Sequence, residues 1–243
     1  MVMIKLTLIE GDALKVLPTL PSESVDLIIA DPPFFVLKQD PNLESAEWDY
    51  FKDLNEFLEF TKKWLRECYR VLKNNSQMYV FWSQKWQKEF WNLDQPFEIK
   101  RMLIWDNPCK TKGFTSKMYL WNYTPIFFLS KGDIVKFNAS FTKKENVDVF
   151  RFPAPQPNFK KDKQFHPCQK PYELIKILIK NSSNEGDTVL DPFLGSGTTM
   201  KACLELKRNC IGIEINPKYV EITKKRLNWG SSLGNVIFEF KKF

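Results

Sequence analysis

The stretch Thr188-Val189-Leu190-Asp191-Pro192-Phe193-Leu194-Gly195-Ser196-Gly197-Thr198-Thr199 decides the fold of this chain. It predicts a short buried strand, a glycine-rich turn and a helix over 197–206. A helix that begins at Gly-x-Gly presents free backbone N–H groups and a partial positive charge, and glycine lets a ligand approach the backbone closely. Asp191, at the end of the strand, is placed to accept a hydrogen bond from an ammonium group. The stretch therefore predicts a site for a small charged ligand.

An acidic residue, Glu214, ends the next predicted strand, over 210–214. An acid about 20 residues after a glycine turn is placed to bind the two hydroxyls of a ribose. Met200 stands where a dinucleotide site has its third glycine, and no Gly-Lys-Ser/Thr follows the turn as in a phosphate-binding loop. The pair therefore indicates a nucleoside cofactor. The alternative is a tight strand-to-helix turn with a solvated glutamate.

A second string, Asp31-Pro32-Pro33-Phe34, follows another predicted buried strand, 25–30. The exocyclic amine of adenine or cytosine is a poor nucleophile because its lone pair is delocalised into the ring, and acceptors on its N–H bonds free that lone pair. Asp31 offers a carboxylate, Pro32 a carbonyl whose direction Pro33 restricts, and Phe34 a flat face. We interpret the string as a clamp for a planar amine. The alternative is a Pro-Pro turn beside a surface aspartate.

Apolar runs alternate with helical patterns along the chain, which predicts an α/β fold with parallel strands and crossover helices. The predicted strands cover 4–9, 25–30, 77–82, 98–105, 125–130, 188–190, 210–214 and 236–240, and the predicted helices cover 54–72, 170–180, 197–206 and 218–227. Residues 131–165 differ in character, with many lysines and a proline-rich turn. We therefore expect one domain with an insertion at 131–165.

Composition narrows the class of protein. At 243 residues the chain suits one large domain, and its formal charge of +7 favours an anionic partner. The chain has five cysteines without a Cys-x-x-Cys pair and a single histidine, a composition that argues against a zinc site. We therefore expect no metal. The chain has no apolar run of about 18 residues and no signal-peptide pattern. We therefore expect a cytoplasmic protein with no membrane association.

Together these strings resemble the S-adenosylmethionine-dependent DNA amino-methyltransferases of restriction–modification systems, over nearly the whole chain. Asp31–Phe34 is similar to the family's catalytic Asp-Pro-Pro-Tyr motif, with Phe34 keeping the ring of the commoner tyrosine. The stretch 190–199 is similar to its cofactor loop, and Glu214 to its ribose-binding acid. The segments 11–13 and 166–171 are similar to two further cofactor-binding segments.

The resemblance implies a role for each matching residue. Catalysis falls to Asp31, Pro32, Pro33 and Phe34. Cofactor binding falls to Asp12, Ala13, His166, Pro167, Lys170, Asp191, Phe193, Gly195, Ser196, Gly197, Thr198 and Glu214. His166, the only histidine, is interpreted as a cofactor-positioning residue, with a packed structural ring as the alternative. Trp48-Asp49 is interpreted either as a wall over the base pocket or as the lead-in to a helix.

The catalytic string precedes the cofactor string, an order similar to that of the permuted β-class. The resemblance therefore implies a Rossmann-like methyltransferase sheet, circularly permuted, with a short target-recognition insertion. Residues 1–130 are expected to form the catalytic half, 131–165 the insertion, and 166–243 the cofactor-binding half of the same domain. The strand ends before Asp31 and Asp191 are expected to lie side by side at the switch point of the sheet.

The implied activity is methyl transfer to the N6 of a flipped-out adenine in double-stranded DNA. Cytosine-N4 members of the family tend to carry serine where Asp31 stands, so cytosine-N4 methylation is the alternative. A non-catalytic nucleoside-binding DNA protein and a dinucleotide oxidoreductase are two further alternatives. The resemblance also implies a homodimer and allows a cognate restriction endonuclease.

Basic residues interleaved with aromatic residues suit a DNA backbone. Two segments carry them, a loop between two predicted strands and the insertion. The residues expected to bind DNA are Lys110, Lys112, Lys117, Lys143, Lys144 and Arg151, and the insertion also holds Lys131 and Lys136. An ordinary solvated face is the alternative for any one of these lysines.

Overall fold

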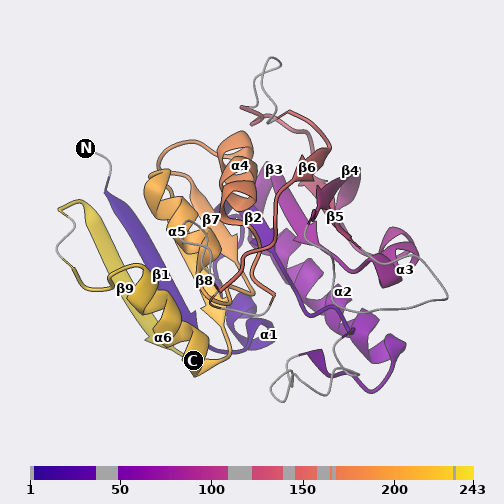
Figure 1. Cartoon of the computed structure of the whole chain (residues 1–243), viewed down its shortest axis with the longest axis horizontal. Helices are drawn as coiled ribbons and strands as arrows, with labels where there is room; N and C mark the ends of the chain where they lie inside the picture. The colour runs from indigo at the N-terminus through magenta and orange to yellow at the C-terminus, as the bar shows by residue number, and fades with distance from the viewer. Residues whose placement is uncertain are drawn as a thin grey trace.

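A computed structural model of the chain describes residues 3–36, 49–108, 122–138, 146–157, 165, 168–231 and 234–243. Within these ranges nine strands form one sheet, in the order β6-β4-β5-β3-β2-β7-β8-β1-β9 (Figure 1). Several residues singled out from the sequence lie outside the described part: Trp48, Lys110, Lys112, Lys117, Lys143, Lys144, His166 and Pro167. The predicted α/β class is confirmed.

One side of the sheet is parallel and the other is mixed. Six strands run parallel to one another: β3 (Leu72–Phe81), β2 (Val25–Ala30), β7 (Thr188–Asp191), β8 (Asn209–Glu214), β1 (Ile4–Glu10) and β9 (Val236–Lys242). Beyond β3, the strand β5 (Tyr123–Lys131) is antiparallel to both β3 and β4 (Glu98–Asp106), and β6 (Val149–Arg151) is parallel to β4. The C-terminal segment thus forms the outer strand beside β1, as its predicted strand suggested.

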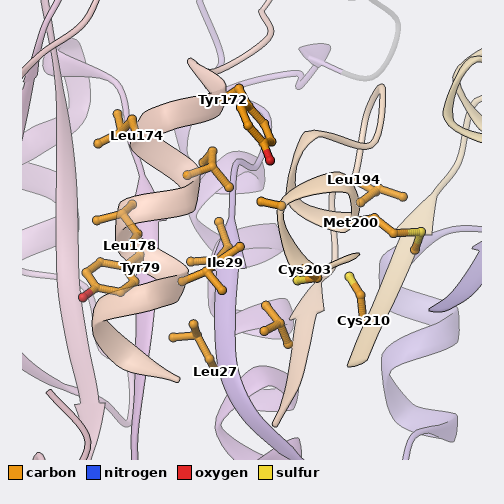
Figure 2. Close-up of a cluster of buried hydrophobic side chains, with 14 of the residues drawn as sticks. Leu27, Ile29, Tyr79, Tyr172, Leu174, Leu178, Leu194, Met200, Cys203 and Cys210 are labelled. Atoms are coloured by element: carbon orange, nitrogen blue, oxygen red, sulfur yellow. The ribbon is translucent and has the colours of Figure 1, made fainter. Parts of the chain in front are cut away.

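Helices cover both faces of the sheet, as parallel strands buried on two sides require. On one face, α4 (Tyr172–Ser182), α5 (Thr198–Glu205) and α6 (Pro217–Arg226) pack on a cluster that includes Leu27, Ile29, Leu178 and Met200 (Figure 2). On the other face lie α1 (Ala13–Val16), α2 (Leu54–Val71) and α3 (Gln87–Trp91), together with the short 3-10 helices Leu17–Thr19 and Gln84–Trp86.

The longest described helix, α2, shows how its sequence sets the packing. Asp53 caps its N-terminus by accepting from the backbone N–H of Glu56 at 2.9 Å. Phe57, Trp64 and Leu65 lie on its inner face and are fully buried. The helix passes into β3 without a loop, so β3 begins at residue 72 instead of at the predicted 77. No described helix is long and apolar enough to cross a membrane.

The pairing of β2 with β7 places the two strings of interest at one edge of the sheet. Leu27 pairs with Val189 and Ile28 with Leu190, so the two strands end together. All six residues of β2 are buried, which explains why the strand is apolar except for Asp26. The expected meeting of the strand ends before Asp31 and Asp191 is confirmed, although the two residues lie far apart in the chain.

Two basic residues of the insertion region are engaged inside the fold. The Lys131 ammonium donates to the carbonyl of Leu72 at 2.8 Å, and its side chain is 10% exposed. Lys136 donates to Asp187 at 2.8 Å and to Asp26 at 3.2 Å. Asp26 and Asp187 lie at the beginnings of β2 and β7, opposite the edge that carries Asp31. Both ammonium groups are therefore bound within the domain at the edge of the sheet opposite Asp31, which argues against the expected contact of Lys131 and Lys136 with DNA.

Candidate active site

A cavity of about 220 Å³ opens at the edge where β1, β2, β7 and β8 end. It brings together most of the predicted site residues that the structure describes. Those that line it are Asp12, Ala13, Asp31, Pro32, Pro33, Phe34, Lys170, Asp191, Phe193, Gly195, Ser196, Thr198 and Glu214. Gly197 lies just behind this lining, as the N-cap residue of α5. The two strings of the sequence therefore form one site.

Asp31 has its two carboxylate oxygens in different surroundings. Oδ2 accepts a hydrogen bond from the ammonium of Lys170 at 2.5 Å. Oδ1 is buried and has no hydrogen-bond partner among the described residues. Burial raises the pKa of Asp31 above its ordinary value, and the nearby charge of Lys170 opposes that rise. A buried acceptor without a donor is costly, so Oδ1 is suited to receive an N–H from a ligand.

Lys170 lies on the Asp31 side of the cavity and is 7% exposed. Besides Asp31, its ammonium donates to the carbonyl of Cys168 at 3.1 Å. It also lies 5.1 Å from the ring centre of Phe34 and 5.5 Å from that of Phe81, within range of cation–π attraction. The resemblance assigned Lys170 to the cofactor. In the structure Lys170 lines the cavity, and its charge contacts the carboxylate and the ring of the Asp-Pro-Pro-Phe string; its assignment to the cofactor stays a prediction.

Asp191 and Glu214 supply two more carboxylates at neighbouring strand ends. Asp191 is 4% exposed, and its Oδ1 accepts from the backbone N–H of Phe193 at 3.0 Å. Burial raises the pKa of Asp191 to about 7, helped by the charges of Asp31 and Glu214 and opposed by hydrogen bonds from Thr199 and Phe193. A carboxylate so poised gains from a cationic partner.

Glu214 links the end of β8 to the glycine turn. Its two oxygens accept from the backbone N–H groups of Gly195 at 2.8 Å and Asn216 at 2.7 Å. Burial raises the pKa of this carboxyl as well, against those hydrogen bonds. The β1 segment joins the same corner, because the N–H of Gly11 donates to the carbonyl of Glu214 at 2.9 Å. Asp12 then caps α1 by accepting from Leu14 at 2.9 Å.

The glycine turn depends on backbone conformations that favour glycine. Gly195 and Gly197 have φ values of 56° and 83°, in the left-handed region. Arg226, at the end of α6, donates to the carbonyl of Ser196 at 2.6 Å and to the hydroxyl of Thr198 at 3.3 Å. Arg226 therefore stabilises the turn by hydrogen bonds, and residues of the same turn line the cavity.

Several contributors to the site were not among the residues to which the sequence assigned a catalytic or binding role. Asp49 lines the cavity, is 1% exposed, and accepts backbone hydrogen bonds from the segment that follows Pro33. Of its two sequence readings, a wall of the pocket fits this position. Arg226 and Gln169 support the glycine turn. Apolar walls come from Ile29, Phe60, Phe81, Ile213, Ile215 and Tyr219. No sequence pattern distinguished these six residues from other apolar residues of the chain.

Of the six residues expected to bind DNA, the structure describes Arg151. Its side chain is 73% exposed and lies 3.4 Å from a carboxylate oxygen of Asp106. Arg151 pairs with Asp106 across β6 and β4, and Asp106 pairs with Tyr123 of β5. Because β5 pairs with β3, whose carboxyl end lies at the cavity, Arg151 lies on the same edge of the sheet as the cavity.

Within the described ranges, no group of three His, Cys, Asp or Glu residues is arranged to hold a metal ion.

Comparison with known proteins gives consistent likenesses. A family model described as "DNA methylase" matches residues 25–225. Type II methyltransferase M.HpaI of Haemophilus parainfluenzae is 34% identical over 240 residues, covering 91% of this chain and 74% of that protein. DNA adenine methyltransferase YhdJ of Escherichia coli (strain K12) is 35% identical over 253 residues, covering 93% and 83%.

The fold is also similar to solved structures. The crystal structure of the M1.HpyAVI–SAM complex superimposes with a TM-score of 0.68 at 26% sequence identity. The match covers 91% of this chain and 99% of the other. The likeness thus extends through both strings that meet at the cavity.

Proposed function

This chain belongs to the DNA methylase family, and we propose that it transfers a methyl group from S-adenosylmethionine to the exocyclic N6 of adenine in double-stranded DNA. The observation that carries the proposal is the buried Oδ1 of Asp31, which has no hydrogen-bond partner among the described residues; Asp31 lines one cavity with Asp191 and Glu214. The name of the Escherichia coli relative, a DNA adenine methyltransferase, supports adenine as the target.

The residues of the cavity fit the cofactor by their chemistry. Glu214 is placed for the ribose hydroxyls, Asp191 for the ammonium group, and Asp12 for the exocyclic amine of the adenine. Ile213 and Phe193 offer apolar surface for the flat base. When bound, S-adenosylmethionine supplies an activated methyl group on a sulfonium centre. The turn 195–198 would hold its amino-acid end, and we propose that His166 and Pro167 help there.

The clamp acts on the target amine through fixed acceptors. Asp31 Oδ1 and the carbonyl of Pro32 accept its N–H bonds and so free the nitrogen lone pair for attack. Acceptors set in place before the reaction need no reorganisation, and such preorganisation is usually a large part of catalysis. Lys170, bound to Asp31 Oδ2 at 2.5 Å, fixes the orientation of the carboxylate and leaves Oδ1 as the acceptor for the amine. Phe34 offers its ring to the base.

A base inside a duplex cannot enter this cavity, so the target must leave the base stack. Extrusion costs a few kcal/mol. Stacking on an aromatic ring such as Phe34 returns roughly 1–3 kcal/mol per base. Phosphate contacts supply the remainder. We propose Arg151 for this role because it is exposed on the same edge of the sheet, together with Lys110, Lys112, Lys117, Lys143 and Lys144, which lie outside the described residues.

The organisation of the chain fits the same proposal. The catalytic string on β2 precedes the cofactor string on β7, although the two strands pair directly. We propose that this order is a circular permutation, with a catalytic half over 1–130, target recognition by 131–165 and a cofactor half over 166–243. We propose a cytoplasmic location because the proposed substrate is DNA. A homodimer and a cognate restriction endonuclease are proposed partners.

The test is methyl transfer to unmethylated genomic DNA with isotopically labelled cofactor. Digestion to nucleosides should yield labelled N6-methyladenine, and sequencing should place the label at one short recurrent sequence. Labelled N4-methylcytosine would support the alternative target and overturn adenine. Absence of label from DNA, with cofactor bound, would overturn the methyltransferase proposal.

Cofactor affinity should depend on pH because of Asp191. Its pKa of about 7 in the free protein lies above its ordinary value, and a bound ammonium group favours the ionised form. Binding must therefore release a proton below pH 7. We expect affinity to rise by up to about tenfold per pH unit as the pH increases toward 7, and to level off above it.

Isothermal titration calorimetry from about pH 5 to about pH 9, roughly two units on either side of this pKa, measures the cofactor affinity. The Tm is recorded at each pH to confirm that the protein is folded. The Asp191→Asn variant is the control, because it removes the titrating group. Its affinity should be weaker at neutral pH and vary less with pH. A pH-independent affinity of the unaltered protein would contradict the assigned role of Asp191.

A further inference from the structure

The segment that follows Pro33 is held by the carboxylate of Asp49. Oδ1 of Asp49 accepts from the backbone N–H groups of Phe34 at 2.5 Å and Phe35 at 2.6 Å, and Oδ2 accepts from that of Val36 at 2.9 Å. Three successive N–H groups thus converge on one side chain. Such a concave run of N–H groups is an anion-binding shape, and here the anion is part of the chain.

The backbone needs this support. Phe35 has a φ of 54°, in the left-handed region that residues with a Cβ seldom adopt. Its ring lies against Phe57 and Trp86, with ring centres 5.6 Å and 5.8 Å away. Packing of the Phe35 ring and the hydrogen bonds of Asp49 together fix a conformation that the chain would otherwise leave.

The clamp is therefore restrained from both sides. Pro33 restricts the backbone of Pro32 from within the string. Asp49 accepts a hydrogen bond from the N–H of Phe34, the last residue of the string. Asp49 also lines the cavity and is 1% exposed. The orientation of the Phe34 ring and of the Pro32 carbonyl thus depends on a carboxylate outside the Asp-Pro-Pro-Phe motif.

We propose that Asp49 is a positioning residue for methyl transfer, which acts by holding Phe34 and the Pro32 carbonyl where the target base needs them. The inference rests on the proposed function of the clamp. It predicts a defect in the rate of transfer and not in cofactor binding, because Asp49 contacts the base side of the cavity through Phe34 and the cofactor carboxylates belong to β7 and β8.

The Asp49→Asn variant tests the proposal. Asparagine keeps one acceptor oxygen and its size, but its NH₂ group then faces an N–H donor of the 34–36 segment. We expect kcat, expressed per cofactor-binding site titrated by calorimetry, to fall at least tenfold, with the Kd for cofactor within threefold of the unaltered protein. A merely structural residue would reduce the number of binding sites and leave kcat per site unchanged.

Asp53→Asn is the matched control. Asp53 is also a backbone-capping aspartate, at the start of α2, and asparagine serves equally well as an N-cap residue. We expect this variant to keep the unaltered kcat per site. If Asp49→Asn binds no cofactor, Asp49→Glu takes its place, because it keeps both acceptors but displaces them by one methylene, and the same fall is expected.

An unchanged kcat per site in either variant, or loss of cofactor binding in both, overturns the proposal. Asp31→Ala is measured in the same assay to separate this result from the proposed function. An active Asp31→Ala protein would refute the clamp itself. An inactive Asp31→Ala protein together with a fully active Asp49→Asn protein would refute only the role of Asp49.

Discussion

Replacement of Asp31 by alanine is expected to reduce methyl transfer to DNA on the order of a thousandfold, the loss typical when a preorganised polar group is removed from a reacting centre. The variant removes the buried Oδ1 that has no partner among the described residues, and with it the main acceptor for the target amine. Cofactor affinity should change little, because Asp191, Glu214 and the glycine turn are untouched. Labelled-methyl incorporation and calorimetry measure the two quantities.

Two further variants sharpen this result. Asp31→Asn keeps the volume and one acceptor but loses the ion pair with Lys170, so it should retain more activity than Asp31→Ala. Asp94→Ala is the matched control, because the Asp94 side chain is 87% exposed and neither Asp94 nor its ion-pair partner Arg66 lines the cavity. The activity of this variant should equal that of the unaltered enzyme. Transfer by Asp31→Ala within tenfold of the unaltered rate would rule out the clamp.

Replacement of Gly197 by alanine is expected to destabilise the protein and weaken cofactor binding together. The residue has a φ of 83°, and a Cβ there would lie 2.7 Å from Cγ2 and 2.8 Å from Oγ1 of Thr223, which is fully buried. The left-handed conformation costs about 1–2 kcal/mol for a residue with a Cβ, and overpacking adds about 1–3 kcal/mol. Because the turn 195–198 lines the cavity, its displacement also disturbs the cofactor site.

Thermal unfolding should show the effect of Gly197→Ala as a Tm lower by roughly 5–15 °C, given about 2–4 °C per kcal/mol for a chain of this size. Gly230→Ala is the matched control, since Gly230 has the same φ of 83° and no atom of the described residues lies within 4 Å of the added Cβ. Its Tm should fall by the conformational part alone. Equal losses in the two variants would mean that contact with Thr223 is unimportant.

Much of the fold could be predicted because its strands and helices carry strong local patterns. The six residues of β2 form an apolar run around Asp26, and the helix over 54–71 has apolar residues at regular helical spacing, so both were predicted nearly to their ends. The short elements were missed. The strand β6 has three residues and is defined by its pairing with β4, and such pairing leaves no periodicity in the sequence.

The site could be predicted as far as its motifs reach. Asp31, Asp191 and Glu214 follow apolar strands, and parallel strands present their carboxyl ends at one edge, so their meeting could be foreseen. The contact between Lys170 and Asp31 could not, because it joins residues that are distant in the chain. Asp49 was harder still, because it binds backbone N–H groups, and any residue type supplies those. From the sequence, Trp48-Asp49 was interpreted as a wall over the base pocket or as the lead-in to a helix, and neither interpretation included hydrogen bonds to the 34–36 backbone.

The account depends most on where the target base binds. A crystal structure with S-adenosylhomocysteine and a duplex that carries the mapped methylation site measures this directly. We predict an extruded adenine whose N6 lies within hydrogen-bond distance of Asp31 Oδ1 and the Pro32 carbonyl, with its ring against Phe34 and the cofactor product between Asp191 and Glu214. A target base bound elsewhere, with Oδ1 of Asp31 still without a donor, would contradict the account.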